Sequence, residues 1–230
     1  MLYDVSLVAL IGSILCLDRF LFQVMISRPI VVAPIIGFLM GDFYTGLIVG
    51  TFLELFWADC LPVGAYIPPN ESIAAVIMTA TAVLTGRTFH ANQQELIAAS
   101  ALLTMPVGIL GQRVDTLLMR SNDRLSQKAL EVAKTGSDSW IRKGHVYSIF
   151  KALFAYFLMI ILGTLIGMTV LTCLVPYFQA PVWKALQIIY YILPVIGIAV
   201  ALRAIHVRGG IPVFSAIFLG ILIIAQWLRG

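Results

Sequence analysis

GDFYTGLIVGTFLELFWADCLPVGAYIPPNE, residues 41–71, combines two features that seldom occur together. It begins as an apolar run that could lie in a bilayer, yet it contains Glu54 and Asp59 and then breaks at several proline and glycine residues. A carboxylate at membrane depth costs roughly 2.5 kcal/mol or more on insertion scales, so such residues are kept mostly where they function. Irregular backbone at that depth persists only where protein buries it or where it lines a wet cavity. We therefore expect this stretch to build a polar binding site between helices, with the rest of the chain as its scaffold.

The composition places the whole chain in a membrane. Its 230 residues are 60% hydrophobic and 11% charged, with a mean hydropathy of +0.99, whereas a soluble domain carries about 25% charged residues. The sequence therefore predicts an all-α, polytopic integral membrane helical bundle, with a re-entrant or broken-helix segment in its first half. Residues 1–230 are expected to form a single domain. The net charge of +4 does not indicate nucleic acid, because the cations lie in short connections, as they do in membrane proteins.

Signatures of an enzyme, a metal site or a cofactor site are absent from the sequence. The cysteines Cys16, Cys60 and Cys173 are widely separated and surrounded by apolar residues, which suits neither a disulfide nor a metal site. The chain has no His-Glu-x-x-His, Cys-x-x-Cys, Gly-x-Ser-x-Gly or phosphate-binding loop. We expect a protein that is not an enzyme and that uses no cofactor or metal.

The first apolar segment, Val5–Met25, is long enough for one membrane span. It contains Asp18 followed directly by Arg19. Consecutive residues on a helix point about 100° apart, so Asp18 and Arg19 cannot both face lipid. Asp18 is predicted either to pair with Arg19 or another cation, or to serve in a binding site.

The next apolar segment, Ile30–Ala58, is longer than one span requires and is interrupted by Gly-Asp at residues 41–42. This pattern suits a helical hairpin or a re-entrant pair. Ser72–Leu84 is too short to span and is predicted to be a half-helix or the inner arm of a re-entrant loop. Asn70 suits an N-cap for that helix, and Glu71 suits its first turn.

Residues 119–145 are predicted to be a cytoplasmic amphipathic loop. Arg120–His145 contains six of the fifteen lysine and arginine residues against three acids, which is typical of a cytoplasmic connection. Its apolar positions suit a helix that stops at Gly136 and lies on the membrane surface or a partner, although a solvated helix fits equally well. The other predicted spans are Glu95–Met119, His145–Leu174, Lys184–Leu202 and Ile211–Leu228.

The candidate binding residues differ in how strongly structure alone explains them. Glu54 has no basic neighbour in the sequence, so a function is the better explanation for its carboxylate. Asp59 could lie near an interface, and Asn70 and Glu71 equally suit helix-cap roles. An aromatic ring in the same stretch, such as that of Trp57 or Tyr66, could stack on a ring of the ligand. The residues predicted to bind substrate are Glu54, Asp18, Asn70, Asp59, Glu71 and Trp57.

Several short motifs occur in an order that resembles a known family. They are Ser-Arg-Pro at 27–29, Gly-Asp at 41–42 followed by Thr-Gly at 45–46, Gly50 to Glu54, Val-Gly-Ala at 63–65 before Pro-Asn at 69–70, the Arg120–His145 loop, and Leu-Pro-x-x-Gly at 193–197. With these motifs, nearly the whole chain resembles the membrane IIC component of the mannose–fructose–sorbose class of the bacterial sugar phosphotransferase system.

This resemblance implies a sugar permease subunit in the bacterial inner membrane. Such a subunit pairs with a homologous IID membrane subunit, and the IIC–IID units assemble into homo-oligomers. Cytoplasmic IIA and IIB proteins phosphorylate the incoming sugar. The IIC component itself carries no phosphorylated residue. The chain departs from mannose-type members at Pro62, where they have Asn, and at Asn70, where they have Asp, and their first-helix acid lies closer to the Arg-Pro pair than Asp18 does. Glu54 keeps its family position.

Two other functions also fit the residues. The first is an ion-coupled secondary transporter in which Glu54 and Asp18 are proton or sodium sites. The second is a regulatory or assembly subunit in the membrane that transports nothing. In each case the lipid bilayer is the chain's immediate surrounding.

Overall fold

The computed structural model describes residues 2–60, 63–89, 93–133, 138–204, 212–213 and 215–217, and these ranges contain helices and loops but no strand. The all-α prediction is confirmed. The helices are α1 (Leu2–Cys16), α2 (Pro29–Leu39), α3 (Phe43–Phe56), α4 (Glu71–Phe89), α5 (Gln93–Ala133), α6 (Asp138–Leu174) and α7 (Ala180–Ala204), with 3-10 turns η1 (Leu17–Arg19) and η2 (Val175–Tyr177). Pro62, Gly136 and most of the predicted span Ile211–Leu228 lie outside the described residues.

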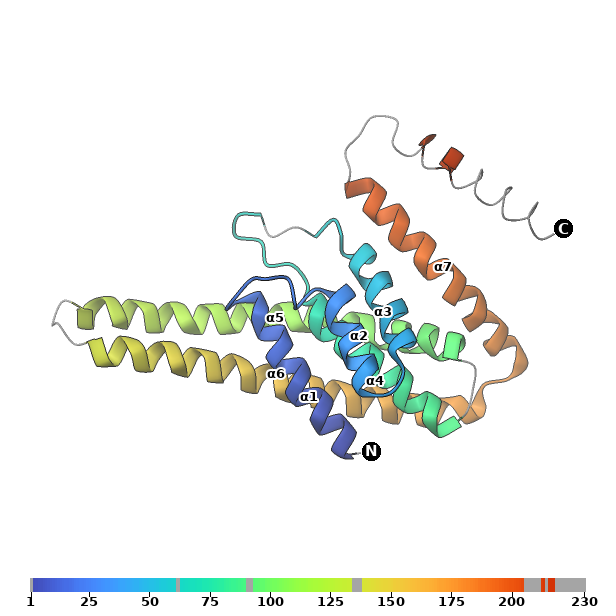
Figure 1. Ribbon diagram of the computed structural model, residues 1–230, viewed down its shortest axis with the longest axis horizontal. Helices are drawn as coiled ribbons and strands as arrows, with labels where there is room; N and C mark the ends of the chain where they lie inside the picture. The colour runs from blue at the N-terminus through green and yellow to red at the C-terminus, as the bar shows by residue number, and fades with distance from the viewer. Residues whose placement is uncertain are drawn as a thin grey trace.

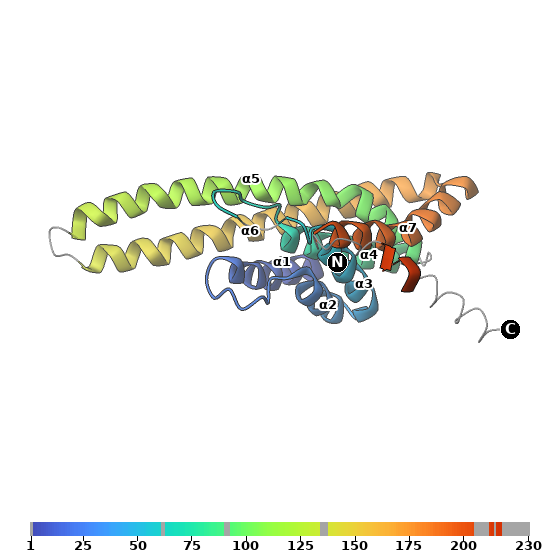
Figure 2. The same cartoon turned by 90° about the horizontal axis from the view of Figure 1, so that it is seen from above.

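Helix α4 lies at the centre of the bundle. It contacts α1, α2, α3, α5 and α6, and every residue from Ser72 to Thr85 is buried. Figure 2 shows it between the α5–α6 pair and the group formed by α1, α2 and α3. The hydroxyl groups of Thr79, Thr81 and Thr85 find no hydrogen-bond partner within the described part of the protein. From Ser72 to Thr85, helix α4 is therefore surrounded by other helices.

Helices α5 and α6 form a long antiparallel pair that extends beyond the other helices (Figure 1). Two glycines let α6 approach α4 closely. A Cβ atom added at Gly163 would lie 2.5 Å from the Ile77 Cδ1 atom, and one added at Gly167 would lie 2.8 Å from the Thr81 Oγ1 atom. Small residues spaced four apart are a common means of close helix packing in membranes.

Helices α2 and α3 form the predicted hairpin across residues 41–42. Gly41 has a φ of +74°, a conformation that side chains rarely adopt. Asp42 then caps α3, because its carboxylate accepts hydrogen bonds from the Thr45 backbone N–H at 3.0 Å and from the Thr45 hydroxyl at 2.6 Å. Gly46 packs directly against the Ala33 carbonyl group, so a Cβ atom there would collide with backbone. The prediction of a broken segment in the first half is confirmed.

Four of the described helices, α4 to α7, are long and apolar enough to cross a membrane. The prediction that Ser72–Leu84 forms only a half-helix is wrong, because α4 has 19 residues and continues to Phe89. Its last turn is held by Arg87, whose guanidinium group donates to the Met40 carbonyl and lies 3.9 Å from the Asp4 carboxylate. These partners lie on other helices, so the polar end of α4 remains helical.

The prediction that Val5–Met25 forms one span is also wrong. Helix α1 ends at Cys16, and a loop follows in which Gln23 and Met25 adopt positive φ angles of 53° and 67°. Hydrogen bonds from this loop to Asp18 hold the turn. Helix α1 is therefore shorter than the helices that can cross a membrane by length.

The predicted amphipathic loop at 119–145 is not a separate helix. Helix α5 continues without a break from its apolar part to Ala133, and α6 begins at Asp138. The described basic residues of this segment therefore lie on the two helix ends that project beyond the rest of the bundle (Figure 1), and Lys134 lies outside the described residues.

Candidate functional site

Asp115 on α5 is the centre of a buried polar cluster. Its carboxylate is fully buried and accepts a hydrogen bond of 2.7 Å from the Tyr156 hydroxyl of α6 and one of 3.0 Å from the Asn70 side-chain amide. The Nε atom of Arg19 lies 4.0 Å from the same carboxylate. A buried carboxylate needs this number of donors to offset the loss of water. The cluster therefore ties together η1, α5, α6 and the loop before α4.

The irregular segment before α4 is held by side chains that donate hydrogen bonds to its backbone carbonyl groups. Arg19 donates to the carbonyl oxygens of Pro68 at 3.2 Å and Pro69 at 3.4 Å. The Gln112 side-chain amide donates to the Ile67 carbonyl. Proline supplies no backbone N–H, so carbonyl acceptors are the groups through which this segment can be fixed.

Asn70 performs the predicted capping role and two further ones. Its Oδ1 atom accepts from the Ile73 backbone N–H at 3.1 Å, which caps α4, and its own N–H donates to the Gly108 carbonyl at 2.9 Å. The Asn70 side chain also packs against Gly111, where an added Cβ would lie 2.6 Å from the Asn70 Cβ. Asn70 is fully buried. A residue that caps one helix and bonds to a second fixes the angle at which the broken segment enters α4.

Glu54 on α3 forms an ion pair with Arg28 at the start of α2. The Arg28 Nε atom lies 2.6 Å from the Glu54 Oε1 atom, and the Ile30 backbone N–H lies 3.4 Å from Oε2. The carboxylate thus sits at the N-terminus of α2, where the helix dipole favours negative charge. The interpretation of Glu54 as a carboxylate without a nearby cation is wrong. The Glu54 side chain is 18% exposed and that of Arg28 is 48% exposed, so water reaches the pair.

Glu71 is linked electrostatically both to the ion pair and to Arg19 of the buried cluster. It occupies the first turn of α4, as predicted, and it interacts electrostatically with Arg19, Glu54 and Arg28. We call the group that these contacts join the polar site. The polar site consists of Arg19, Arg28, Glu54, Asn70, Glu71 and Asp115.

Asp18 lies beside the polar site and supports the loop that leads into it. Its carboxylate accepts from the backbone N–H groups of Val24 at 3.1 Å and Ser27 at 3.2 Å. Burial alone would raise the pKa of Asp18, but these N–H donors outweigh it and hold the pKa below its ordinary value. The structure shows no ion pair between Asp18 and Arg19, so that alternative is wrong. Asp18 instead holds the loop that carries Arg28.

Asp59 and Trp57 make no hydrogen bond or ion pair to a member of the polar site among the described residues. Asp59 is exposed and accepts a weak hydrogen bond of 3.6 Å from the Cys60 thiol. Trp57 is 8% exposed. Its ring stands edge-on to Phe56 at 5.5 Å and packs on Gly108, where an added Cβ would lie 2.9 Å from the indole. Trp57 therefore fills the interface between the end of α3 and α5.

Three members of the polar site were missing from the sequence-based prediction: Arg19, Arg28 and Asp115. Asp115 carried a usable signal, since an acid within a predicted span is a functional candidate by default. It also follows Gly108, Gly111 and Gln112 on α5 at helical spacing, which marks the face that meets the broken segment. Among the described residues, no group of three or more His, Cys, Asp or Glu side chains could hold a metal ion.

Sequence comparison relates the chain to sugar permeases. The family described as "PTS system sorbose-specific iic component" matches residues 2–227. N-acetylgalactosamine permease IIC component 1 of Escherichia coli K12 is 28% identical over 220 residues, which are 95% of this chain and 79% of that protein. The mannose-specific EIIC component of the same organism is 30% identical over 154 residues, which are 65% of this chain and 51% of that protein. The sorbose-specific EIIC component of Klebsiella pneumoniae is 27% identical over 94% of this chain and 76% of its own length.

Solved structures share the fold. A cryo-EM structure of the mannose transporter ManYZ with microcin E492 superimposes with a TM-score of 0.63 and 20% identity, covering all of this chain and 96% of that chain. A structure described only as a membrane protein gives a TM-score of 0.70 and 22% identity, covering all of this chain and 91% of that chain. The arrangement of helices described above is therefore one that occurs in known membrane proteins.

Proposed function

Because the chain belongs to the family of sorbose-specific IIC components of the phosphotransferase system and transports sugar as such a component, we propose that the polar site binds the sugar. The convergence of Glu54, Arg28 and Glu71 at the starts of α2 and α4 is the observation that supports this site. Sugar hydroxyls both donate and accept hydrogen bonds. An ionised carboxylate only accepts hydrogen bonds and a guanidinium group only donates them. A site that contains both groups therefore suits a ligand rich in hydroxyl groups.

The members of the polar site are proposed to have different roles. Glu54 and Arg28 are partly exposed and therefore accessible to a ligand, and Glu71 stands next to them. Asp115 and Asn70 are fully buried and already bonded within the protein, so they position the site. Asp18 has the same supporting role through the loop that carries Arg28.

Asp59 and Trp57 remain candidates of a second kind. Both lie in the segment that follows α3, and an exposed aromatic in the same segment, Tyr66, could stack on a sugar ring. Their contribution requires a movement that exposes Trp57 or brings the segment over the polar site. The described contacts of Trp57 are with Phe56 and Gly108.

The family also suggests the partners and the location. We propose that the chain works with a IID membrane subunit in the bacterial inner membrane, in homo-oligomers of IIC–IID units, and passes sugar to cytoplasmic IIA and IIB proteins for phosphorylation. It contributes no catalytic or phosphorylated residue in this scheme. The polar site lies at the end of α4 that meets Asp115 in the later part of α5, on the side of the basic segment 119–145. By the positive-inside rule this end faces the cytoplasm, where phosphorylation would occur.

The test is sugar uptake and binding by Glu54→Gln, with Asp42→Asn as the matched control. Both acids lie on the α2–α3 hairpin, but Asp42 caps α3 at its opposite end. Hydrogen bonds to a charged group contribute about 1.5–3 kcal/mol each, so Glu54→Gln should weaken binding by roughly ten- to a hundredfold. Rates are divided by the amount of folded protein in the membrane. Normal uptake per folded Glu54→Gln molecule would contradict the proposed site, and uptake that an uncoupler abolishes but that ignores loss of the phosphotransfer proteins would contradict the proposed system.

A further inference from the structure

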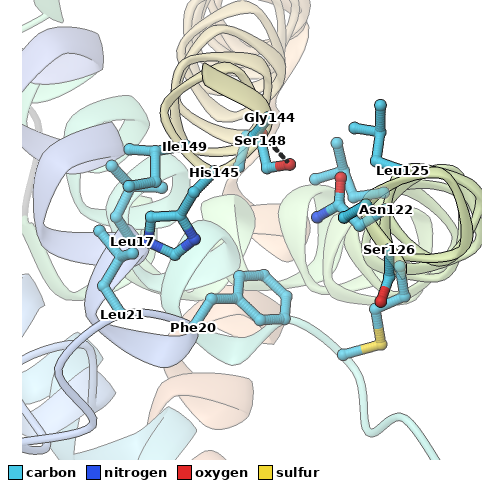
Figure 3. A pocket seen from close by; sticks show the side chains of 14 residues that line it. Leu17, Phe20, Leu21, Asn122, Leu125, Ser126, Gly144, His145, Ser148 and Ile149 are labelled. Atoms are coloured by element: carbon cyan, nitrogen blue, oxygen red, sulfur yellow. Dashed lines mark hydrogen bonds between the residues drawn. The ribbon is translucent and has the colours of Figure 1, made fainter. Parts of the chain in front are cut away.

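A cavity of about 430 Å³ lies between the turn after α1 and the projecting parts of α5 and α6 (Figure 3). It contains no member of the polar site. Binding pockets for small molecules commonly have volumes of about 300–1,000 Å³, so this cavity is large enough for a ligand or for part of one. Its lining includes Leu17, Phe20, Leu118, Asn122, His145 and Ser126.

The inner end of the cavity, toward Tyr156, is apolar. Leu17, Phe20, Leu118 and Ala152 line it. The Phe20 ring stacks on Tyr156 with centroids 6.2 Å apart and an interplanar angle of 23°. Phe20 therefore lies between the cavity and the tyrosine that donates to Asp115. An apolar lining of this kind suits a hydrocarbon chain better than a sugar.

The outer end presents hydrogen-bond donors. Figure 3 shows His145 and Asn122 pointing toward the same space as Phe20. Lys151 donates to the Asn122 Oδ1 atom at 2.6 Å, which leaves the NH₂ group of Asn122 as its free donor. The lining includes no aspartate or glutamate. Such a mouth favours a ligand with anionic oxygens.

The charge on the surface around the cavity also favours an anionic ligand, because it is mostly positive. Five cations are exposed on the turns that flank the cavity, against two exposed acids; the cations are Arg120, Arg124, Lys128, Arg142 and Lys143, and the acids are Asp123 and Glu131. The cavity also lies where the apolar parts of α5 and α6 pass into the basic segment, which is the level of a lipid headgroup on the cytoplasmic side. That leaflet carries anionic lipids, and each nearby lysine or arginine contributes about 1 kcal/mol to their attraction.

We propose that this cavity binds one anionic phospholipid. An acyl chain occupies the apolar inner end against Phe20 and Leu118, and the headgroup phosphate lies at the mouth beside His145 and Asn122, whose side chain is hydrogen-bonded to Lys151. The lipid then fills the gap between α5, α6 and the loop that carries Arg19. This inference does not depend on which sugar is transported or on where the sugar binds.

The experiment measures lipid retained by the full-length purified protein, after washing in detergent, by native mass spectrometry. Phosphatidylglycerol is compared with phosphatidylethanolamine of the same acyl chains and with inorganic phosphate. Ala129→Trp fills the cavity from its lining, and Leu130→Trp is the matched control because Leu130 is 68% exposed and does not line it. Lys151→Gln removes the cation that is hydrogen-bonded to Asn122 of the lining. Lys184→Gln is its control, because Lys184 is exposed on α7 and does not line the cavity.

We expect phosphatidylglycerol to bind and inorganic phosphate not to bind. Each displaced methylene group should cost about fourfold in affinity, so Ala129→Trp should reduce retention by roughly tenfold or more while Leu130→Trp leaves it unchanged. Lys151→Gln should reduce retention of phosphatidylglycerol by about fivefold and that of phosphatidylethanolamine by less. Equal retention by Ala129→Trp and Leu130→Trp, equal binding of the two lipids, or binding of phosphate alone would each overturn the proposal. The melting temperature of each washed variant without lipid identifies one that has failed to fold, and Ala152→Leu then replaces Ala129→Trp.

Discussion

The Arg28 guanidinium group and the Glu54 carboxylate meet at 2.6 Å across the α2–α3 hairpin, although 26 residues separate them in the sequence. The contact places the side chain of one helix on the first turn of the other. Because both charges are partly exposed, the pair can hold the hairpin closed and still offer an acceptor and a donor to a ligand.

This ion pair should show coupling in a double-mutant cycle. Arg28→Gln and Glu54→Gln should each destabilise the protein, and the double variant should lose less than the sum of the two. A coupling energy of about 1 kcal/mol is expected, since solvent weakens pairs with an exposed partner. The measurement is the melting temperature in detergent together with the amount of protein in the membrane. Strictly additive losses would contradict a direct interaction.

The hydrogen bond between Tyr156 and Asp115 should contribute substantially to stability. Tyr156→Phe removes only the hydroxyl and leaves the buried carboxylate with one fewer donor, which should cost about 1.5–3 kcal/mol of the free energy of unfolding. Tyr147→Phe makes the same chemical change on the same helix at a side chain that is 59% exposed, so it should have an effect within about 0.5 kcal/mol. Equal stability of the two variants would show that Asp115 finds its partners elsewhere.

The close approach of α2 and α3 at Gly46 should tolerate no side chain. In Gly46→Ala, the added Cβ would collide with the Ala33 carbonyl, so the two helices must separate. Gly64→Ala is the comparison, since Gly64 has a positive φ of 63° but open space around it. It should cost only the backbone strain of about 1 kcal/mol. We expect Gly46→Ala to reduce the folded protein in the membrane well below the level of Gly64→Ala, and the reverse order would be inconsistent with the packing of the hairpin.

The orientation of the chain can be tested by labelling cysteines in a cysteine-free background. Gln127 is exposed on the projecting part of α5, and Gln179 is exposed in the loop before α7, at the other end of α6. An impermeant thiol reagent should label Gln179→Cys in intact spheroplasts and Gln127→Cys only after the cells are opened. The opposite result would place the basic segment outside.

Features that depend on local chemistry were predictable from the sequence. The Gly-Asp break at 41–42 and the cap at Asn70 both appear as expected, because a turn glycine and a capping side chain act on residues only three or four positions away. The all-helical fold followed from the composition, since spanning segments must satisfy their own backbone groups.

Features that depend on contacts between distant segments were not predictable. The length of α4 was underestimated, because Arg87 looked like the start of a polar turn while its partner carbonyl is at Met40. The end of α1 was missed because Asp18 bonds to backbone N–H groups that no pattern in the sequence reveals. Glu54 seemed isolated for the same reason, since its partner Arg28 lies on another helix.

The burial of α4 from Ser72 to Thr85 has a consequence for how the protein is made. Its mean hydropathy is lower than that of α6 and α7, and its buried threonine hydroxyls would meet lipid if it entered the bilayer alone. The lipid hydrocarbon stabilises a segment of this kind only slightly, whereas packing against neighbouring helices stabilises it strongly. We expect ribosome-bound chains that stop after α4 to integrate it poorly, and chains that include α5 and α6 to integrate it fully. Biogenesis of the first half would then wait for synthesis of the second.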